Sequence, residues 1–543
     1  MNLSQKNIAF FLILIAFISL GFKLYLVDFS NPVYSDNLDY TLYAIAHTNG
    51  DFSQSSHRGM AWSLFMFPFF KLIDSDNFLD YSNAARILSL SIATFTILPV
   101  YLLGRKFFAE KYSLVVASLF AFEPHLNYNS GFGLSEPLYN LAIIGAFYFV
   151  LNKNTKYILP SLLLAGIVWW TRINGYAVFI AITAIYFIVY RKSSNRFQNY
   201  TLGVVIFLIV VAPMLLQKYE QFGDPFYTDY NDRIFTGSYE KIVSANIQSE
   251  SALDYINKNG IMLFIYTFIL TGFYNTLSSL ATISFPYLFI LLPFGILFSL
   301  RAFDENSKFI VANWIFILVS LIMVILPMSV IPEKRFLYYL FPSLIIFSTI
   351  IIQRITEYGL STFSLTKKQK NIFLIIILSI VIVLSGLFTL RYEKPDLVLE
   401  HEKMEFAKFA IANLNGKTLN DAGSALDYVN YLLIDTPPGN FKNYKINLNM
   451  YSELRGEENN FERIFIYGES LNEIISNGEK FGLRYLISNE NEGYFHPFVD
   501  DVYANEKQYP YLIKVFDSHE NGFEKLKLKV FEIDYEKFHK LIP

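Results

Sequence analysis

The sequence predicts a polytopic α-helical membrane protein that carries a C-terminal extracytoplasmic α/β domain. Of its 543 residues, 53% are hydrophobic and only 17% are charged, whereas about a quarter of the residues in a soluble protein are charged. The deficit of charge lies in the first 390 residues, which contain many apolar runs long enough to cross a bilayer. From Tyr392 onward, charged residues become frequent and the apolar runs shorten.

The lengths of the apolar runs and the charges beside them predict about eleven transmembrane helices. These helices are expected near residues 8–27, 84–104, 112–124, 136–152, 157–170, 175–190, 200–217, 283–300, 309–327, 337–353 and 372–390. The run Ile261–Leu280 is also apolar. We interpret it as a helix that lies at the interface or re-enters the membrane, because a further span would invert the orientation of everything after it.

Lysine and arginine near the span ends predict the orientation of the chain, since such residues concentrate in cytoplasmic loops. They cluster in alternate loops, at Lys6, Arg105, Lys153, Arg191, Arg301 and Arg354. The loops between these are acidic or mixed in charge, so residues 28–83 and 218–282 are expected outside. The N-terminus is then cytoplasmic, residues 1–391 form the transmembrane domain, and residues 392–543 form a soluble domain outside the plasma membrane.

The pattern within the C-terminal region alternates between helix and strand. Met404–Leu414 and Leu471–Phe481 have helical spacing, and Arg463–Tyr467, Leu483–Ser488 and Leu526–Ile533 are typical of strands. This alternation predicts a small α/β domain of ordinary size. Because the chain has no cysteine, the domain must be stabilised by its core alone. A cysteine-free chain with an outward domain favours a prokaryotic cell surface.

Several classes of function are excluded by composition and motifs. The net charge is −3 and there is no basic stripe, so nucleic acid is not an expected partner. Without cysteine there is no thiolate chemistry and no cysteine metal site. The sequence has no Walker loop, no HExxH motif and no GxSxG elbow, which argues against a nucleotide hydrolase, a metalloprotease or a serine hydrolase.

The conspicuous polar residues are all predicted at one membrane face. The stretch Pro32–Tyr40, PVYSDNLDY, follows the first span and carries Asp36 and Asp39. The other residues expected at this face are Tyr40, His57, Arg58, Arg86, Glu123, His125, Glu136, Arg172, Glu333, Lys334 and Arg335. Ionisable groups near the membrane are costly and usually functional. Acids and arginines from at least five segments therefore indicate a reaction site.

These residue types suit a substrate that carries a lipid phosphate. The planar fork of arginine binds phosphate through two hydrogen bonds and keeps its charge at an interface. Arg58, Arg86, Arg172 and Arg335, together with Lys334, are the candidate phosphate ligands. A carboxylate among them can accept the proton of an attacking hydroxyl, and Asp36 is our candidate for this base.

The order of the motifs resembles the GT-C superfamily of polytopic glycosyltransferases, and most of all its protein O-mannosyltransferases and lipid A aminoarabinose transferases. Residues 36–40, DNLDY, match the acidic Asp-Glu-x-x-Tyr motif of the first exterior loop, although Asn37 replaces the usual acid. The other matching stretches are ARILSLSIATFTILPVYLLGRKFF (85–108), EPHLNYNSGFGLSEPLY (123–139), WWTRING (169–175) and EKRFLYYLFP (333–342). The resemblance covers about residues 8–350 and does not extend to the C-terminal domain.

The resemblance implies an inverting glycosyltransferase that uses a polyprenyl (dolichyl) phosphate sugar. Asp36 would then be the general base, with Asp39 as a substitute carboxylate, and Glu136 would position donor or acceptor. Tyr40, His57, Glu123 and His125 are candidates for binding or positioning the acceptor. The acceptor is a hydroxyl of a protein, a glycan or a lipid. No cofactor is certain: some relatives carry a divalent metal, but no spacing of ligands here requires one.

Other interpretations of the same residues stay open at this point. Asp36 also suits a turn or a helix N-terminus, and arginines at an interface can be simple anchors. A membrane transporter or a lipid flippase is the alternative function, although such proteins tend to show repeated halves and charges at mid-membrane. A non-catalytic surface scaffold is the third alternative.

Overall fold

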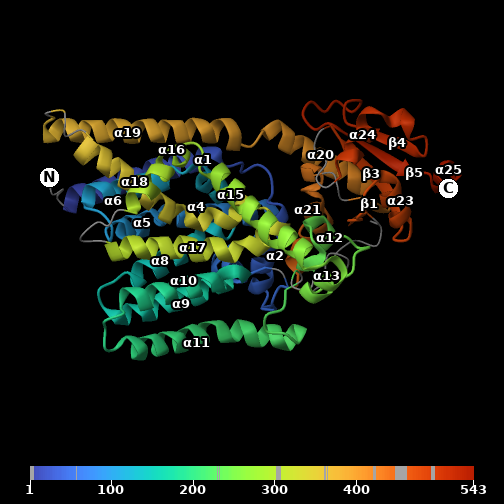
Figure 1. Ribbon diagram of the computed structural model, residues 1–543. Helices are drawn as coiled ribbons and strands as arrows, with labels where there is room; N and C mark the ends of the chain where they lie inside the picture. The colour runs from blue at the N-terminus through green and yellow to red at the C-terminus, as the bar shows by residue number, and fades with distance from the viewer. Residues whose placement is uncertain are drawn as a thin grey trace.

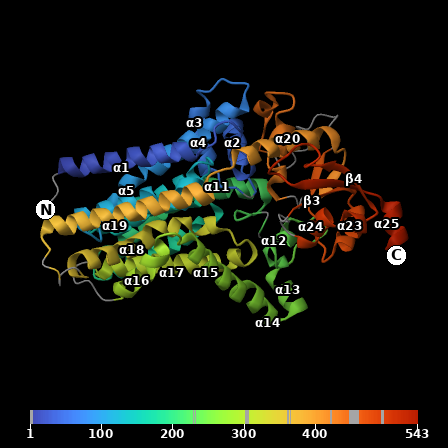
Figure 2. The ribbon, with the colours of Figure 1, turned by 90° about the horizontal axis from the view of Figure 1, so that it is seen from above.

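The computed structural model describes residues 5–56, 58–228, 230, 233–300, 307–359, 363, 365–419, 423–446, 461–490 and 496–542. A bundle of long helices forms one part of the molecule, and an α/β domain lies at one end of it (Figure 1). The N-terminus lies at the opposite end of the bundle in both views (Figures 1 and 2). The fold class predicted from the sequence is therefore confirmed.

Each predicted span coincides with a helix or with two consecutive helices. They are α1 (Gln5–Leu26), α4 (Phe78–Phe95) with α5 (Ile97–Gly104), α6 (Glu110–Ala121), α8 (Glu136–Val150), α9 (Ile158–Thr171), α10 (Tyr176–Val189), α11 (Arg196–Phe222), α16 (Leu288–Ser299), α17 (Ser307–Val330), α18 (Phe341–Arg354) and α19 (Lys367–Phe388). Among the described residues, seven helical stretches are long and apolar enough to cross a bilayer. Shorter apolar helices, among them α8 and α10, pack between them.

The segment after residue 260 differs from the expectation of an interfacial or re-entrant helix. The elements α14 (Ile261–Phe264), η4 (Ile265–Leu270) and α15 (Thr271–Ile283) form one continuous helix with the length and hydropathy of a span. In Figures 1 and 2 this helix and α16 follow one another from the domain end of the bundle to its opposite end. The two together therefore make a single passage along the bundle, so the extra helix adds no reversal of direction.

Two short helices near the domain end position the first acidic residues. The helix α2 (Ser35–Thr48) begins with Asp36 in its first turn, and α3 (Ala61–Phe70) packs against it. The ring of His47 joins them, since Nδ1 contacts the carbonyl of Asp51 and Nε2 contacts the hydroxyl of Ser63. The indole of Trp62, fully buried, donates to the carbonyl of Gly133 in the bundle. These contacts give the Asp36 turn a fixed place over the bundle.

The C-terminal domain contains a five-stranded mixed sheet with the order β2-β1-β3-β5-β4. Its strands are β1 (Lys417–Leu419), β2 (Glu462–Ile464), β3 (Leu483–Asn489), β4 (Leu512–Asp517) and β5 (Leu528–Ile533). The first three in sheet order are parallel, and β5 pairs antiparallel with both β3 and β4. Helices α20 (Leu397–Asn413) and α23 (Leu471–Glu479) contribute to two separate hydrophobic cores of the domain. The sequence did not predict β1, which is very short, or β4, which lies at an edge with three consecutive exposed residues.

Aromatic packing holds the domain against the bundle. The ring of Phe441, fully buried, lies 5.2 Å from Phe78 and 5.6 Å from Tyr81 between centroids. On another side, the amide of Ala245 donates to the carbonyl of Phe465 at 2.9 Å. The domain is thus attached both to α4 and to the residues just after α12 (Tyr239–Val243), which places it beside the acidic turn of α2.

Glu402 of α20 is expected to stabilise the domain strongly. Its carboxylate accepts three backbone hydrogen bonds, from Glu524, Lys525 and Leu526, at 2.7–2.9 Å. In Glu402→Gln the amide NH₂ faces these donors, and a lost bond to a charged group costs about 2 kcal/mol. We expect this loss of unfolding free energy in denaturant titrations of the full chain. Glu405→Gln, an exposed acid of the same helix, is the control, and equal effects of the two variants would contradict the prediction.

Candidate active site

The carboxylate of Asp36 contacts two guanidinium groups from distant parts of the chain. Its Oδ1 atom lies 2.8 Å from Nη2 of Arg58, and its Oδ2 atom accepts a hydrogen bond of 3.0 Å from Nη1 of Arg335. Asp36 and Arg335 are 299 residues apart in the sequence. Both carboxylate oxygens are therefore ion-paired, each with a different arginine.

Asp39 lies one helical turn after Asp36 and shares one of these arginines. Its Oδ2 atom lies 3.1 Å from both Nε and Nη2 of Arg58. Since residues three apart share a face of an α-helix, both acids point to the same side of α2. The guanidinium of Arg58 thus bridges the two carboxylates.

A second acid continues the network into the bundle. Glu136, the first residue of α8, is buried, and its Oε1 atom accepts a hydrogen bond of 2.7 Å from Nη1 of Arg172. The same oxygen lies 3.8 Å from Nη1 of Arg335, whose Nη2 atom is 2.6 Å from Glu333. Arg335 therefore contacts three carboxylates and joins Asp36 to Glu136. It belongs to η5 (Lys334–Leu340), the short helix before α18.

The arginines keep Asp36 ionised. Burial raises the pKa of its carboxyl, but the charges of Arg58 and Arg335, with a contribution from Arg172, outweigh burial and hold the pKa well below its usual range. Conversely, burial lowers the pKa of Arg58, and the two aspartates raise it well above its ordinary value. Asp36 and Arg58 are therefore both charged at neutral pH.

Two cavities flank the pair formed by Asp36 and Arg58. One, of about 240 Å³, is lined by Val33, Tyr34, Asp36, Arg86, Tyr128 and Arg335, among others. Tyr34, Arg86 and Tyr128 also line a neighbouring cavity of about 40 Å³ that reaches Tyr428 of the domain. The other, of about 150 Å³, is lined by Arg58, Trp169, Tyr176, Met214, Lys218 and Phe226, among others. The network therefore separates a cavity beneath the domain from one beside α11.

No family model matches the sequence, and no curated protein matches it either. Among solved structures, the oligosaccharyltransferase of Archaeoglobus fulgidus tethered to an acceptor peptide is similar, with a TM-score of 0.56 and 14% identity. That match covers 90% of this chain and 69% of the other. The same enzyme with zinc and sulfate scores 0.52, at 15% identity over 88% and 68% of the two chains. With an inhibitory peptide and dolichol phosphate it scores 0.50, at 14% identity over 89% and 69%. ArnT from Cupriavidus metallidurans bound to undecaprenyl phosphate scores 0.47, with 10% identity over 96% of this chain and 97% of that one.

The chain has the GT-C fold. The resemblance inferred from the motifs is thereby confirmed at the level of the fold. Identities of 14–15% show the fold alone, so the branch with protein O-mannosyltransferases and aminoarabinose transferases stays a prediction.

Within this GT-C fold, the residues expected at the site lie at different distances from the network. Those in the network are Asp36, Asp39, Arg58, Glu136, Arg172 and Arg335. Tyr40 is buried next to it, where its hydroxyl accepts a hydrogen bond of 3.4 Å from Ser135. Arg86 lines the same cavity as Asp36, but its Nη1 atom donates to the carbonyl of Asn31 and to Asn83. Lys334 is exposed, and His57 lies outside the described residues.

Glu123 and His125 lie in a separate buried group. Glu123 caps the short helix α7 (Pro124–Ser130) by accepting from the amide of Leu126, and Nδ1 of His125 lies 3.4 Å from Glu393. In the described part of the chain, no hydrogen bond or ion pair joins either of them to the Asp36 network. A role for Glu123 and His125 in positioning the acceptor therefore stays a prediction.

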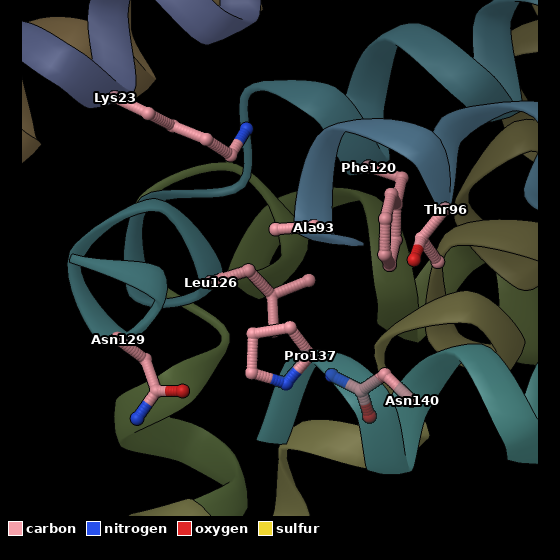
Figure 3. A pocket seen from close by; sticks show the side chains of 8 residues that line it. All are labelled: Lys23, Ala93, Thr96, Phe120, Leu126, Asn129, Pro137 and Asn140. Carbon is pink, nitrogen blue, oxygen red and sulfur yellow. The ribbon is translucent and has the colours of Figure 1, made fainter. Parts of the chain in front are cut away.

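Lys23 was not singled out by the sequence analysis, although a lysine inside an apolar span is an unusual signal. It is buried in α1 and donates to the carbonyl of Ala121, two residues before Glu123. Figure 3 shows Lys23, Asn129 and Asn140 around a small cavity of about 20 Å³. These side chains come from α1, α7 and α8, so this polar group joins three elements of the bundle.

A glycine brings the two arginine-bearing loops together. A Cβ atom at Gly59 would clash with the backbone carbonyl of Thr171. Because Gly59 follows Arg58 and Thr171 precedes Arg172, this close approach sets the two guanidinium groups on neighbouring loops. The tetrapeptide HRGM (57–60) therefore contains a packing signal as well as a charge.

Proposed function

We propose that this protein is an inverting glycosyltransferase that moves a sugar from a polyprenyl phosphate donor to an acceptor hydroxyl. The reaction takes place at the outer face of the plasma membrane, beneath the C-terminal domain. The acceptor belongs to a protein, a glycan or a lipid. The protein is multi-pass, with its N-terminus in the cytoplasm and its domain outside.

One observation carries the proposal more than any other. The carboxylate of Asp36 lines a cavity beside the C-terminal domain and is paired with Arg335, while its second partner, Arg58, lines a different cavity. A base next to one cavity and a cation next to another suit a reaction between two substrates that enter separately. An ion pair with a purely structural role would not need a cavity on each side of it.

The donor fits the cavity beside α11. That cavity has mostly apolar and aromatic walls, with the cations of Arg58 and Lys218 at its polar side. Residues of α11 next to it, such as Leu216 and Tyr219, are exposed apolar groups at the surface of the helix bundle. An apolar pocket lined by two basic side chains matches a lipid chain that ends in a phosphate. The dolichol phosphate bound by the Archaeoglobus enzyme supports this class of ligand.

The acceptor hydroxyl approaches from the Asp36 side. Its oxygen attacks the anomeric carbon and its proton passes to Asp36, while the bond between that carbon and the phosphate oxygen breaks. The leaving phosphate needs only neutralisation, which Arg58 and Arg335 supply through fixed charge. A single displacement inverts the anomeric carbon. Glu136 holds Arg172 and Arg335 in place for this step.

The residues present do not fit a divalent metal between these acids. The described residues contain no group of three or more His, Cys, Asp and Glu side chains able to hold one. Asp36 and Asp39 both contact Arg58, and Glu136 contacts Arg172. A hard cation prefers several free carboxylate oxygens, whereas both oxygens of Asp36 and one oxygen each of Asp39 and Glu136 already face guanidinium groups. No step of the proposed reaction uses a metal.

The proposal is tested with purified protein and a panel of radiolabelled polyprenyl phosphate hexoses and pentoses, offered with a membrane and cell-wall extract as acceptor. We expect label to leave the lipid and to appear in an acceptor fraction. Heat-inactivated protein is the control. Movement of intact labelled lipid across liposomes without cleavage would instead support a flippase and contradict the transferase.

A further inference from the structure

The guanidinium of Arg58 lies between two carboxylates, in the position that a metal cation would take. Its Nη2 atom is 2.8 Å from Oδ1 of Asp36 and 3.1 Å from Oδ2 of Asp39, and its Nε atom is 3.1 Å from the same oxygen of Asp39. The two acids are one turn apart on α2 and point to the same side. One guanidinium thus contacts both carboxylates, and Asp36 has Arg335 as a second partner.

The neighbouring acids of the network are paired with other arginines. The Oε1 atom of Glu136 is held by Arg172, and Glu333 is held by Arg335. Each acid of the network therefore contacts at least one guanidinium. A guanidinium stays charged at every physiological pH, so none of these partners leaves by losing a proton.

Local structure keeps Arg58 in this position. The backbone amide of Arg58 donates to the hydroxyl of Ser55 at 3.1 Å. The next residue, Gly59, is pressed against the carbonyl of Thr171, where no side chain fits. The origin of the Arg58 side chain is therefore fixed between α2 and the end of α9, within reach of both aspartates.

We propose that Arg58 is a built-in substitute for a divalent cation between Asp36 and Asp39, and that the site works without a metal. The guanidinium holds the two carboxylates together despite their like charges. It also lines the cavity that contains Lys218, where it offers positive charge to an anionic phosphate. The catalytic part of this inference rests on the proposed function, whereas its cation-binding part does not.

The inference predicts that removal of Arg58 creates a metal site. In Arg58→Ala the carboxylates of Asp36 and Asp39 lose the cation that bridges them, although Asp36 keeps its contact with Arg335. Mn²⁺ has the charge and the preference for oxygen to take the bridging position. We expect the full-length wild-type protein in detergent to bind no Mn²⁺ at this site. The variant should bind one Mn²⁺ at least about tenfold more tightly than the wild type, as measured by electron paramagnetic resonance.

The double variant Arg58→Ala/Asp39→Asn provides the control, because it lacks one of the two carboxylates and should lose the new site. Arg58→Gln keeps most of the side-chain stem and replaces Arg58→Ala if the alanine variant does not fold. One Mn²⁺ bound to the wild type and lost in Asp36→Asn would overturn the inference. A folded Arg58 variant that gains no Mn²⁺ would overturn it as well.

Turnover gives an independent reading of the same inference. Chelation with EDTA should change wild-type transfer by less than about twofold, a negligible difference in free energy. Loss of activity in EDTA that Mn²⁺ restores would contradict a metal-free site. If the wild type transfers no sugar at all, the proposed function fails, while the Mn²⁺ titrations still decide the identity of the cation.

Discussion

Asp36→Asn is expected to reduce sugar transfer by about 100- to 10,000-fold, the range that a general base contributes. The amide has the shape of the carboxylate but does not accept the proton of the attacking hydroxyl. Arg58 keeps its contact with Asp39 and Arg335 keeps its contact with Glu333, so the variant should still fold. Initial rates with a saturating labelled donor measure the effect.

The control for this variant is Asp74→Asn, which removes an exposed acid from the same segment between α1 and α4. It should leave transfer unchanged. Because the pKa of Asp36 lies well below its usual range, the wild-type carboxylate stays ionised from pH 5 to 8. Protonation of Asp36 in the free enzyme should therefore cause no fall in kcat/KM on the acid side of this pH range. Normal activity of Asp36→Asn would refute the assignment of the base.

Arg335→Ala is expected to have the second largest effect, because this side chain contacts Asp36, Glu136 and Glu333. Its loss removes a donor to the leaving phosphate and leaves Asp36 with one cation fewer. Removal of a comparable donor from an active site costs about 100- to 1,000-fold in rate. We expect a fall in kcat/KM for the donor of this order.

The variant Arg335→Lys separates charge from shape at this position. Lysine keeps the charge but lacks the planar fork that reaches several carboxylates at once, so we expect only partial activity. Arg391→Ala, an exposed arginine after α19, is the control and should be fully active. Equal activity of Arg335→Ala and wild type, in folded protein, would show that Arg335 is only an anchor.

Part of the site could be predicted from the sequence because its charged residues stand next to long apolar runs. Asp36 and Asp39 stand in a polar stretch after the first span, and Glu136 begins an apolar run, so each was conspicuous. Arg86 was equally conspicuous, but its side chain donates hydrogen bonds to the carbonyl of Asn31 and to the side chain of Asn83. Lys23 was overlooked because one charge hardly changes the mean hydropathy of a span.

The sequence by itself determined that this is a helical membrane protein with a separate α/β domain, and it located most of the long apolar helices. Hydropathy and residue periodicity are local properties, so each stretch of the sequence shows them directly. Only the tertiary structure decided that Arg58 bridges Asp36 and Asp39, and that Arg335 joins Asp36 to Glu136. Such pairing depends on how helices hundreds of residues apart pack together, and the local sequence around a charged residue does not indicate its partner.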